Sequence, residues 1–200
     1  GLVPPGARLS GESYRQSAGA VSPASWPLAD PRAVLYAQLS QLSLDKMPRS
    51  TLVAPDSFPQ NQIAPAIQQL LGEQLSFYIN LELIEPSQWP QRLSAGDWQL
   101  AILSSAQISG DPQQLLSAFA TGAAGNLAAV SLPDYDAQLS QALSSGDAAS
   151  LGRAERLLVD AAALLPLYHA STYLYCDPRL SGAIYHPTTG ALDLTSLTAA

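Results

Sequence analysis

The side chains that could carry out catalysis in this sequence are few, and their spacing fits no hydrolase. Serines are abundant, but the chain has no G-x-S-x-G nucleophile elbow. Two histidines could act as an imidazole base. His169 lies inside an aromatic segment, where a structural histidine is the simpler interpretation, and His186 precedes Pro187 in a turn-rich segment. A hydrolase would rest on serine abundance alone, so we rank it last among the function classes.

Metal and cofactor chemistry has equally little support. Asp134 and Asp136 are paired carboxylates, but at the start of a predicted helix they serve more simply as a cap and a partner of the helix dipole. No H-E-x-x-H is present, and Cys176 is the only cysteine, which excludes an intrachain disulfide and a cysteine-based zinc cluster. The glycine-bearing loop at 121–126 lacks the Lys and the Ser or Thr of a P-loop. We therefore expect no metal and no cofactor.

The length of 200 residues suits one domain, or one lobe of a larger protein. Hydrophobic residues make up 47% of the sequence, and the formal net charge is −7. The nine Lys and Arg residues are scattered and form no basic stripe, so nucleic acid is not expected as a partner. No apolar run approaches the ~18 residues of a membrane span. The chain opens with Gly1 and a proline-rich segment, and we interpret it as a piece of a longer protein.

The best candidate for a binding site is the loop Ser104–Gly110. It follows the apolar run Trp98–Leu103, which is too short for a helix and is predicted to be a strand buried on both faces. A helix with Asp111 as its N-cap and Pro112 at its first position comes after the loop. Ligands of open α/β sheets bind outside the carboxyl ends of the strands, which makes this loop the expected binding region. The alternative is an ordinary strand–loop–helix connection.

The segments from Ser50 onward alternate between strand and helix patterns. Pro65 is expected in the first turn of its helix, since a proline deeper in a helix costs about 3 kcal/mol. The predicted order is strand Ser50–Ala54, helix Phe58–Ser76, strand Phe77–Ile84, helix Ser87–Leu93, strand Trp98–Leu103 and the helix from Asp111. Such alternation predicts α/β architecture, with βαβ units, a largely parallel sheet and right-handed crossovers.

The remaining segments give further helices and a turn-rich tail. Gly1–Leu28 has no sustained period and is interpreted as extended, irregular chain. The other predicted elements are helices at Asp30–Leu44, from Asp134 as a cap, and at Ser150–Leu165, a strand at Leu167–Tyr175, and short extended pieces at Ala183–His186 and Ala191–Leu194. The predicted domains are an entry segment (1–29), an α/β ligand-binding lobe (30–175) and a C-terminal return segment (176–200).

Several motifs carry a family resemblance through their order and spacing. They are Leu2–Gly6 (LVPPG), the Trp98 strand with Asp111-Pro112, Leu116 and Phe119, Gly125-Asn126 followed by Pro133–Asp136 with Leu139 and Ala142, Ala154–Tyr168 ending in LPLY, and Ser181-Gly182 with the tail Pro187–Leu194. Together they resemble the C-terminal lobe of the bacterial ABC-transporter solute-binding proteins of family 5, the oligopeptide, dipeptide and nickel type. The likeness covers nearly all of this chain, while the chain covers only the last part of a typical member.

The resemblance implies a type II periplasmic-binding-protein-like lobe, with a mixed, mostly parallel sheet, from a two-lobed extracytoplasmic receptor. Such a receptor is not an enzyme. It closes by hinge motion on a peptide or another small solute and delivers it to an ABC permease in the membrane. It is periplasmic, or a lipoprotein anchored at the cell surface, and is expected to be a monomer at full length. Carried over by position, the ligand-binding residues are Ser104, Ser105, Ala106, Gln107, Ile108, Asn126, Tyr168 and His169.

One departure from the family pattern concerns the ligand's amine. Peptide-binding members have an aromatic and then an acidic residue in the loop, and the acid pairs with the α-amine of the peptide. Counting back from Asp111, these positions are Ser105 and Ile108 here. The resemblance therefore implies a ligand whose facing end is neutral or apolar, unless Ile108 is simply a core residue under the Asp111 helix.

A second interpretation is a sensor domain of the same fold attached to a DNA-binding transcriptional regulator, which would be cytoplasmic. The N-terminal region of the complete protein discriminates between the two. A signal peptide with a lipobox cysteine supports the transport protein, and a helix-turn-helix supports the regulator. The sequence does not name the ligand under either interpretation.

Overall fold

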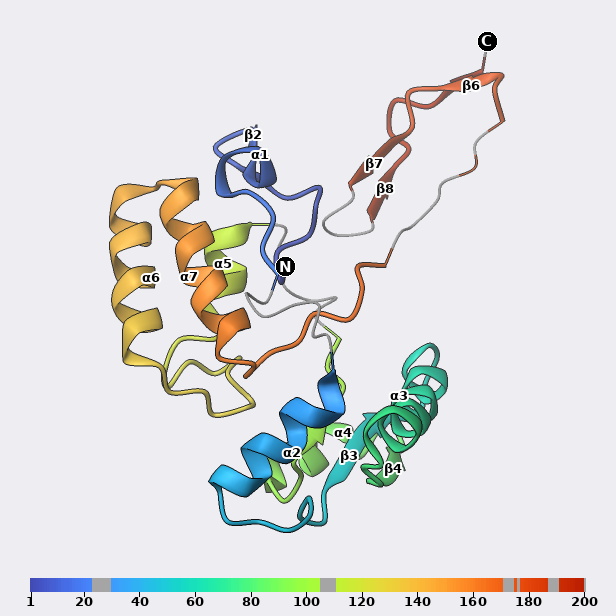
Figure 1. Ribbon diagram of the computed structural model, residues 1–200. Helices are drawn as coiled ribbons and strands as arrows, with labels where there is room; N and C mark the ends of the chain where they lie inside the picture. The colour runs from blue at the N-terminus through green and yellow to red at the C-terminus, as the bar shows by residue number, and fades with distance from the viewer. Residues whose placement is uncertain (23–29, 105–110, 171–174, 176, 187–190, 200) are drawn as a thin grey trace. The chain divides into compact units, whose positions relative to one another are not determined.

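The computed structural model describes residues 1–22, 30–104, 111–170, 175, 177–186 and 191–199 (Figure 1). The chain forms two compact units, one made of Gly1–Ala24 with Ala106–Ala200 and the other of Ser25–Ser105. This division differs from the ranges predicted from sequence, which were 1–29, 30–175 and 176–200. The first residues of the chain pack into one hydrophobic core with helices from its second half, and this explains the difference.

The unit Ser25–Ser105 is built on a three-stranded parallel sheet with strand order β4-β3-β5. Its elements are α2 (Pro31–Gln41), β3 (Thr51–Pro55), α3 (Gln60–Leu75), β4 (Asn80–Ile84), α4 (Trp89–Ala95) and β5 (Leu100–Ala101). In register, Thr51 is paired with Asn80 and Leu52 with Leu100. The predicted βαβ units and parallel sheet are confirmed.

Strand β3 is central because its side chains are apolar on both faces. Leu52, Val53 and Ala54 are each at most 3% exposed. The cluster on one face is covered by the apolar side of α3. It consists of Leu52, Ala54, Ala64, Phe77, Ile79 and Ile102, with Met47, Ile63, Ile67, Leu71, Leu75 and Leu81 packed against it.

Helix α3 corrects two expectations. Pro65 is the sixth residue of the helix and does not lie in its first turn. Pro65 has no N–H, so the hydrogen bond to the carbonyl of Asn61 is missing. The ring of Pro65 is exposed, and the helix is kept intact by the packing of its apolar face on the sheet. The following strand begins at Asn80, not at Phe77. Helix α3 ends at Leu75 and is capped by Ser76 in left-handed backbone (φ 53°), so residues 77–79 are needed to connect it to the strand. Phe77 is still buried, as its alternating pattern predicted.

Strand β5 is shorter and more exposed than the predicted strand Trp98–Leu103. It pairs on one side only within the described sheet, so it is an edge strand. Leu100 is 40% exposed and Leu103 38%, which shows that burial on both faces was wrong. Ile102 alone of this run joins the core. Trp98 is half-buried beside α4, where its Nε1–H donates to the carbonyl of Leu93 at 3.1 Å.

Helix α2 begins where the sequence predicted. The Ala33 N–H donates to Asp30 Oδ1 at 2.9 Å, so Asp30 is the N-cap and Pro31 the first helical residue. From α2 the guanidinium of Arg32 donates to the carbonyls of Glu73 and Gln74, at 3.2 Å each. These carbonyls belong to the last turn of α3, where a cation is favourable for the helix dipole.

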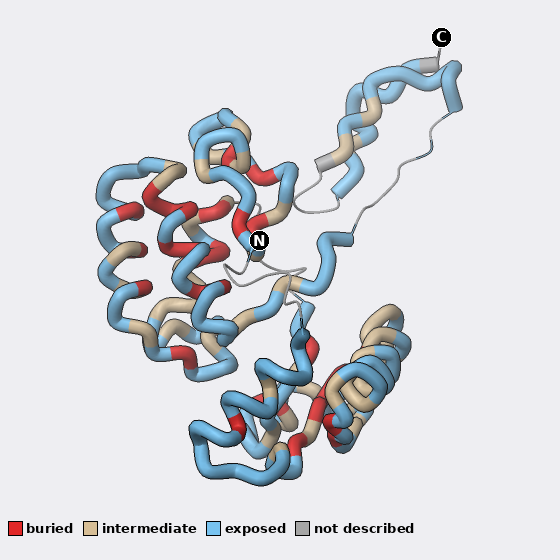
Figure 2. The backbone as a smooth tube through the Cα atoms, in the orientation of Figure 1, coloured by how far each residue is buried: buried red, intermediate tan, exposed pale blue. Residues whose placement is uncertain are grey.

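The other unit is mostly helical. Its elements are β1 (Arg8–Leu9), β2 (Glu12–Ser13), α1 (Tyr14–Ala18), α5 (Pro112–Ser117), α6 (Pro133–Ser145), α7 (Ala148–Asp160), β6 (Leu180–Ser181), β7 (Ile184–His186), β8 (Ala191–Asp193) and β9 (Thr198–Ala199). Helices α6 and α7 lie side by side, joined by Gly146 in left-handed backbone and by Asp147, which caps α7 (Figure 1). Their buried residues line the facing sides of the helices (Figure 2).

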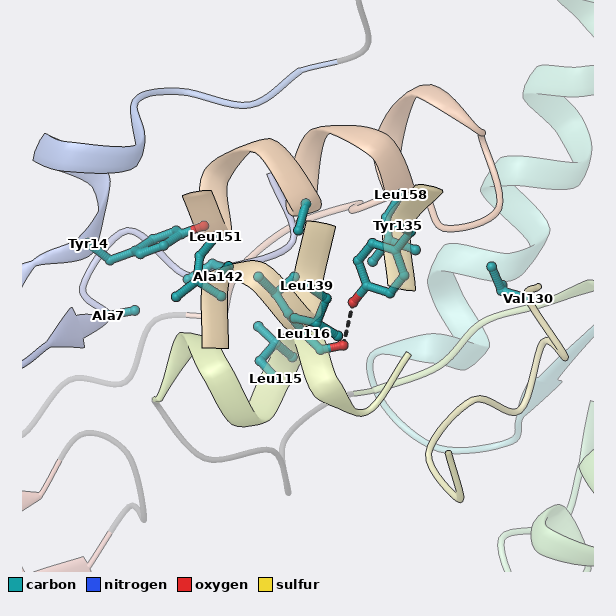
Figure 3. Packing of buried hydrophobic residues seen from close by; sticks show 12 residues of the cluster. Ala7, Tyr14, Leu115, Leu116, Val130, Tyr135, Leu139, Ala142, Leu151 and Leu158 are labelled. Carbon is teal, nitrogen blue, oxygen red and sulfur yellow. Dashed lines mark hydrogen bonds between the residues drawn. The ribbon is translucent and has the colours of Figure 1, made fainter. Parts of the chain in front are cut away.

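The core of this unit joins α5, α6 and α7 to the first residues of the chain. Tyr14, Leu116, Tyr135, Leu151 and Leu158 are each at most 1% exposed (Figure 3). The buried hydroxyl of Tyr135 donates to the carbonyl of Leu116 at 2.5 Å, which fixes α6 on α5. Burial raises the pKa of Tyr135 well above its ordinary value.

Helix starts in this unit are partly as predicted. Asp111 is the N-cap of α5, because the Gln113 N–H donates to its Oδ1 at 2.9 Å. Asp134 is not a cap. Helix α6 begins at Pro133, with Leu132 at the capping position, so Asp134 lies inside the first turn as a partner of the helix dipole.

Three longer predictions in this unit were wrong in part. The first 22 residues are irregular only in part, since residues 8–18 form a β1–β2 hairpin and the short helix α1. The helix predicted at Ser150–Leu165 runs from Ala148 to Asp160, and the predicted strand at Leu167–Tyr175 has no strand in its described part, 167–170 and Tyr175. Aromatic residues favour a strand only where a partner strand is present.

The C-terminal residues form two antiparallel pairs. β7 pairs with β8 and β6 with β9, so the extended pieces predicted at Ala183–His186 and Ala191–Leu194 are confirmed. None of the helices in the described ranges is both long and apolar enough to cross a membrane.

Candidate functional site

The predicted ligand loop starts at the carboxyl edge of the sheet β4-β3-β5. Ser104 follows β5 and is exposed. Ser105, Ala106, Gln107 and Ile108 lie outside the described residues, so their expected role stays a prediction.

Two carboxylates that sequence reasoning missed belong to the same edge. Asp56 and Glu85 directly follow β3 and β4, and parallel pairing brings the ends of these strands together with the end of β5. The side chain of Asp56 is exposed and accepts a hydrogen bond from Asn61 Nδ2 at 3.2 Å. The amide oxygen of Asn61 is buried and accepts no hydrogen bond within the described residues. The exposed carboxylates of Asp56 and Glu85 are hydrogen-bond acceptors, which suit a ligand group that donates. The signal in the sequence is an acid placed just after each of these two strands.

Asn126 has a structural role in its loop. Its Nδ2 donates to the carbonyls of Ala120 (3.1 Å) and Val130 (2.7 Å), and its Oδ1 accepts from the Val130 N–H at 2.9 Å. The neighbouring Gly125 lies so close to Ala118 that an added Cβ would come within 3.0 Å of the Ala118 Cβ. The side-chain amide is thus committed to holding residues 120–130 together.

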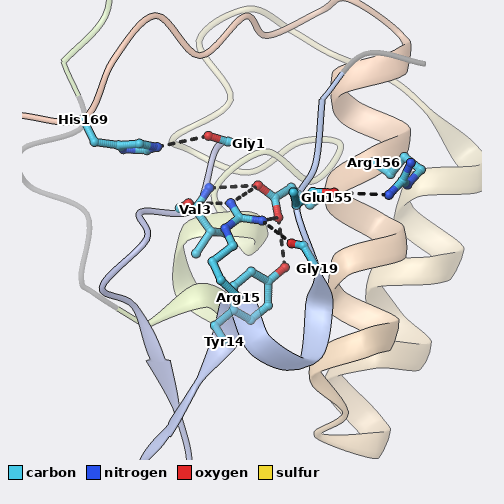
Figure 4. A network of polar contacts seen from close by, with 9 residues as sticks. Gly1, Val3, Tyr14, Arg15, Gly19, Glu155, Arg156 and His169 are labelled. Atoms are coloured by element: carbon cyan, nitrogen blue, oxygen red, sulfur yellow. Dashed lines mark hydrogen bonds and ion pairs between the residues drawn. The ribbon is translucent and has the colours of Figure 1, made fainter.

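Tyr168 and His169 lie in irregular chain after α7, and both side chains are exposed. A ring nitrogen of His169, Nε2, lies 3.1 Å from the carbonyl oxygen of Gly1 (Figure 4). The expectation that His169 lies inside a strand was therefore wrong, because it lies in irregular, exposed chain. His169 instead connects the segment after α7 to the beginning of the chain.

A buried ionic network lies beside this contact (Figure 4). Glu155 of α7 is 0% exposed, and Arg15 forms a two-pronged ion pair with it, Nη1 to Oε2 at 2.8 Å and Nη2 to Oε1 at 2.6 Å. The Tyr14 hydroxyl donates to Oε2 and the Val3 N–H to Oε1, each at 3.0 Å. Arg15 also donates to the carbonyl of Val3. The carboxylate thus accepts four hydrogen bonds, which is what a buried charge requires.

The network perturbs the titration of Tyr14. Burial raises the pKa of Tyr14 far above its ordinary value, and the negative charge of Glu155 raises it further, while the positive charge of Arg15 opposes the shift. Sequence reasoning missed this network because Arg15 and Glu155 are 140 residues apart. The only local signal was a glutamate on the otherwise apolar face of α7.

The titratable side chains of the described residues form no metal centre. The His, Cys, Asp and Glu side chains of these residues form no group of three or more that could hold a metal ion. Among the described residues, Glu155 is the one carboxylate that is fully buried, and all four of its hydrogen bonds come from residues of its own unit.

The architecture, a parallel sheet flanked by helices, is that of a type II periplasmic-binding-protein-like fold. The structure matches the substrate-binding domain of an oligopeptide ABC transporter from Bacillus anthracis str. Ames with a TM-score of 0.73 and 18% identity, over 94% of this chain and 38% of that one. It matches the murein tripeptide binding protein MppA of Escherichia coli with a TM-score of 0.64 and 20% identity, over 90% of this chain and 37% of that one.

The sequence leads to the same group of proteins. No family model matches the chain. In an alignment of 198 residues that covers 96% of the chain, it is 26% identical to the dipeptide-binding protein DppE of Bacillus subtilis (strain 168). The chain spans 36% of the length of that relative. The resemblance to ABC-transporter solute-binding proteins of the oligopeptide and dipeptide type is thereby confirmed.

Proposed function

We propose that this chain is the C-terminal lobe of an extracytoplasmic solute-binding protein that captures a peptide for an ABC importer. The observation that carries the proposal is the alignment with a dipeptide-binding protein over 96% of the chain, with no large region left unmatched. The structures that share the fold include proteins that bind oligopeptides and a murein tripeptide. The chain itself is not an enzyme in this proposal.

The carboxyl edge of the sheet β4-β3-β5 supplies the ligand contacts of this lobe. Ser104 and the loop up to Ile108 follow β5 there, with Asp56 and Glu85 after the neighbouring strands. Hydrogen-bond acceptors and short polar side chains suit the backbone N–H groups of a peptide better than they suit an apolar solute. Tyr168 and His169 contribute where the chain returns toward the other lobe.

The remaining features of the protein follow from this role. A first lobe completes the cleft, and the permease in the membrane receives the peptide when the lobes have closed on it. The protein is periplasmic or lipid-anchored at the cell surface, works as a monomer, and has no contact with nucleic acid.

The test is peptide binding by the complete protein. We expect isothermal titration calorimetry with an equimolar pool of tripeptides to give saturable binding at micromolar concentration, because two lobes together bury most of such a ligand. The same titration with free amino acids serves as the control and should give no binding at these concentrations. A folded protein that binds no peptide of two to five residues even at millimolar concentration contradicts the proposal.

A further inference from the structure

The residues before β1 are attached to the helical core through backbone groups. Val3 is 1% exposed, its N–H donates to Glu155 and its carbonyl accepts from Arg15. Arg15 is held by the same carboxylate. The backbone N–H and the carbonyl of Val3 thus bind the two members of one ion pair. Val3 cannot move without losing these hydrogen bonds.

The fit between these residues and α7 depends on glycine at two places. Gly152 lies one turn before Glu155, and a Cβ there would come within 2.9 Å of the backbone oxygen of Ala18 in α1. At residue 1, a Cβ would overlap the Oε1 of Glu155. The first residues of the chain are therefore packed directly onto the face of α7 that carries Gly152 and Glu155.

The segment after α7 joins the same assembly. His169 lies against the Gly1 carbonyl, and Leu164 packs against the hydrophobic core that also contains Val3. We call residues 1–7 together with 164–169 the strap. The contact of Val3 with Glu155 spans 152 residues of sequence and that of Gly1 with His169 spans 168. Together they hold the first residues of the chain between the middle of α7 and the segment that follows it (Figure 4).

We propose that Glu155 is a positioning residue that makes the strap one rigid piece with α5, α6 and α7. The inference rests on the proposed function in one respect, namely that the strap is where the chain passes between two lobes. Bending that closes the lobes then does not take place within the strap, and loosening the strap at Glu155 makes closure less well defined. Peptide affinity depends on Glu155 although this side chain is fully buried.

The experiment compares three variants of the complete protein. Glu155→Gln keeps the size of the side chain but removes the charge that Arg15 and Val3 require. Arg15→Lys keeps the positive charge and loses the two-pronged geometry. Glu82→Gln is the matched control, because it makes the same chemical change in the ion pair of Glu82 with Arg92, which lies in the other unit. The readouts are amide hydrogen exchange of the strap and affinity for the tripeptide pool.

In Glu155→Gln we expect exchange of the Val3 amide to accelerate at least tenfold more than exchange of the amides of α6 and α7. Arg15→Lys should give a smaller acceleration at the same amide, and Glu82→Gln none. Peptide affinity should fall about tenfold in Glu155→Gln and not in Glu82→Gln. If α6 and α7 exchange faster by the same factor as Val3, Glu155 only stabilises the fold, and the proposal is overturned. Faster exchange of Val3 alone with unchanged peptide affinity also overturns it. If the unmodified protein binds no peptide, the proposed function fails, while the exchange measurement still decides whether Glu155 holds the strap.

Discussion

At the scale of single residues, we propose that the identity of residue 108 decides how the ligand's amine is received. The resemblance to peptide-binding members implies an acidic residue at this position, and Ile108 offers no charge. Burying one member of an ion pair without its partner is unfavourable by about 3–5 kcal/mol. We predict that the complete protein prefers N-acetylated tripeptides to the same peptides with a free amine, and that Ile108→Asp reverses this preference in parallel calorimetric titrations.

The opposite result would identify a different acid. If the unmodified protein binds the free-amine peptides more tightly, Ile108 does not face the amine. Asp56 is then the first candidate, because its carboxylate is exposed at the carboxyl edge of the sheet. Asp56→Asn should in that case remove the preference, whereas Asp97→Asn, at an exposed acid before β5, should leave it unchanged.

Tyr135 gives the protein a predictable response to alkaline pH. Burial raises its pKa in the folded state above the ordinary value near 10 that it has when unfolded. Its contribution to stability is therefore fully present below about pH 10 and is lost as the pH rises toward the folded pKa, with a slope of up to about 1.4 kcal/mol per pH unit. Urea unfolding between pH 9 and pH 11 should show a shallower decline for Tyr135→Phe. Equal slopes in the two proteins would mean that the hydroxyl titrates alike in both states.

At the scale of elements, the sequence predicted best what local chemistry decides. The caps at Asp30 and Asp111 and the alternation of β3, α3 and β4 are short-range patterns, and the structure has them. The first 22 residues show no helical or strand period in their sequence. Their structure depends on hydrogen bonds with Glu155, which is more than 140 residues away. Strand propensity misled at 167–170 for the converse reason, since a strand forms only with a partner. Of the candidate site, the strand end at Ser104 could be predicted from the sequence. That Asp56 and Glu85 lie at the same edge could not, because it follows from the order of the strands in the sheet.

The close approach of α1 to α7 leads to a prediction about two glycines. Alanine normally stabilises a helix relative to glycine by about 0.5–1 kcal/mol. At Gly152 the new Cβ would meet the Ala18 Cβ and backbone oxygen, both at 2.9 Å, so we expect Gly152→Ala to lower the free energy of unfolding by about 1–3 kcal/mol. In α3 the atom nearest to a Cβ on Gly72 is a ring carbon of Tyr78, at 3.3 Å. That ring is 82% exposed and free to turn, so Gly72→Ala should be neutral or stabilising in the same urea titration. A stabilising Gly152→Ala would show that α1 does not rest on α7.

At the scale of the whole molecule, the chain should be a poor receptor on its own. A cleft between two lobes draws its contacts from both, and this chain spans 36% of the length of its dipeptide-binding relative. One lobe leaves much of a peptide in water and cannot exclude solvent by closing, so we expect a Kd of millimolar or weaker, about −4 kcal/mol or less in magnitude. Calorimetry of the 200-residue chain with the tripeptide pool measures this, and the complete protein under the same conditions is the control. Micromolar binding by the 200-residue chain alone would mean that its own carboxyl edge forms a full site, and that the second lobe is dispensable for capture.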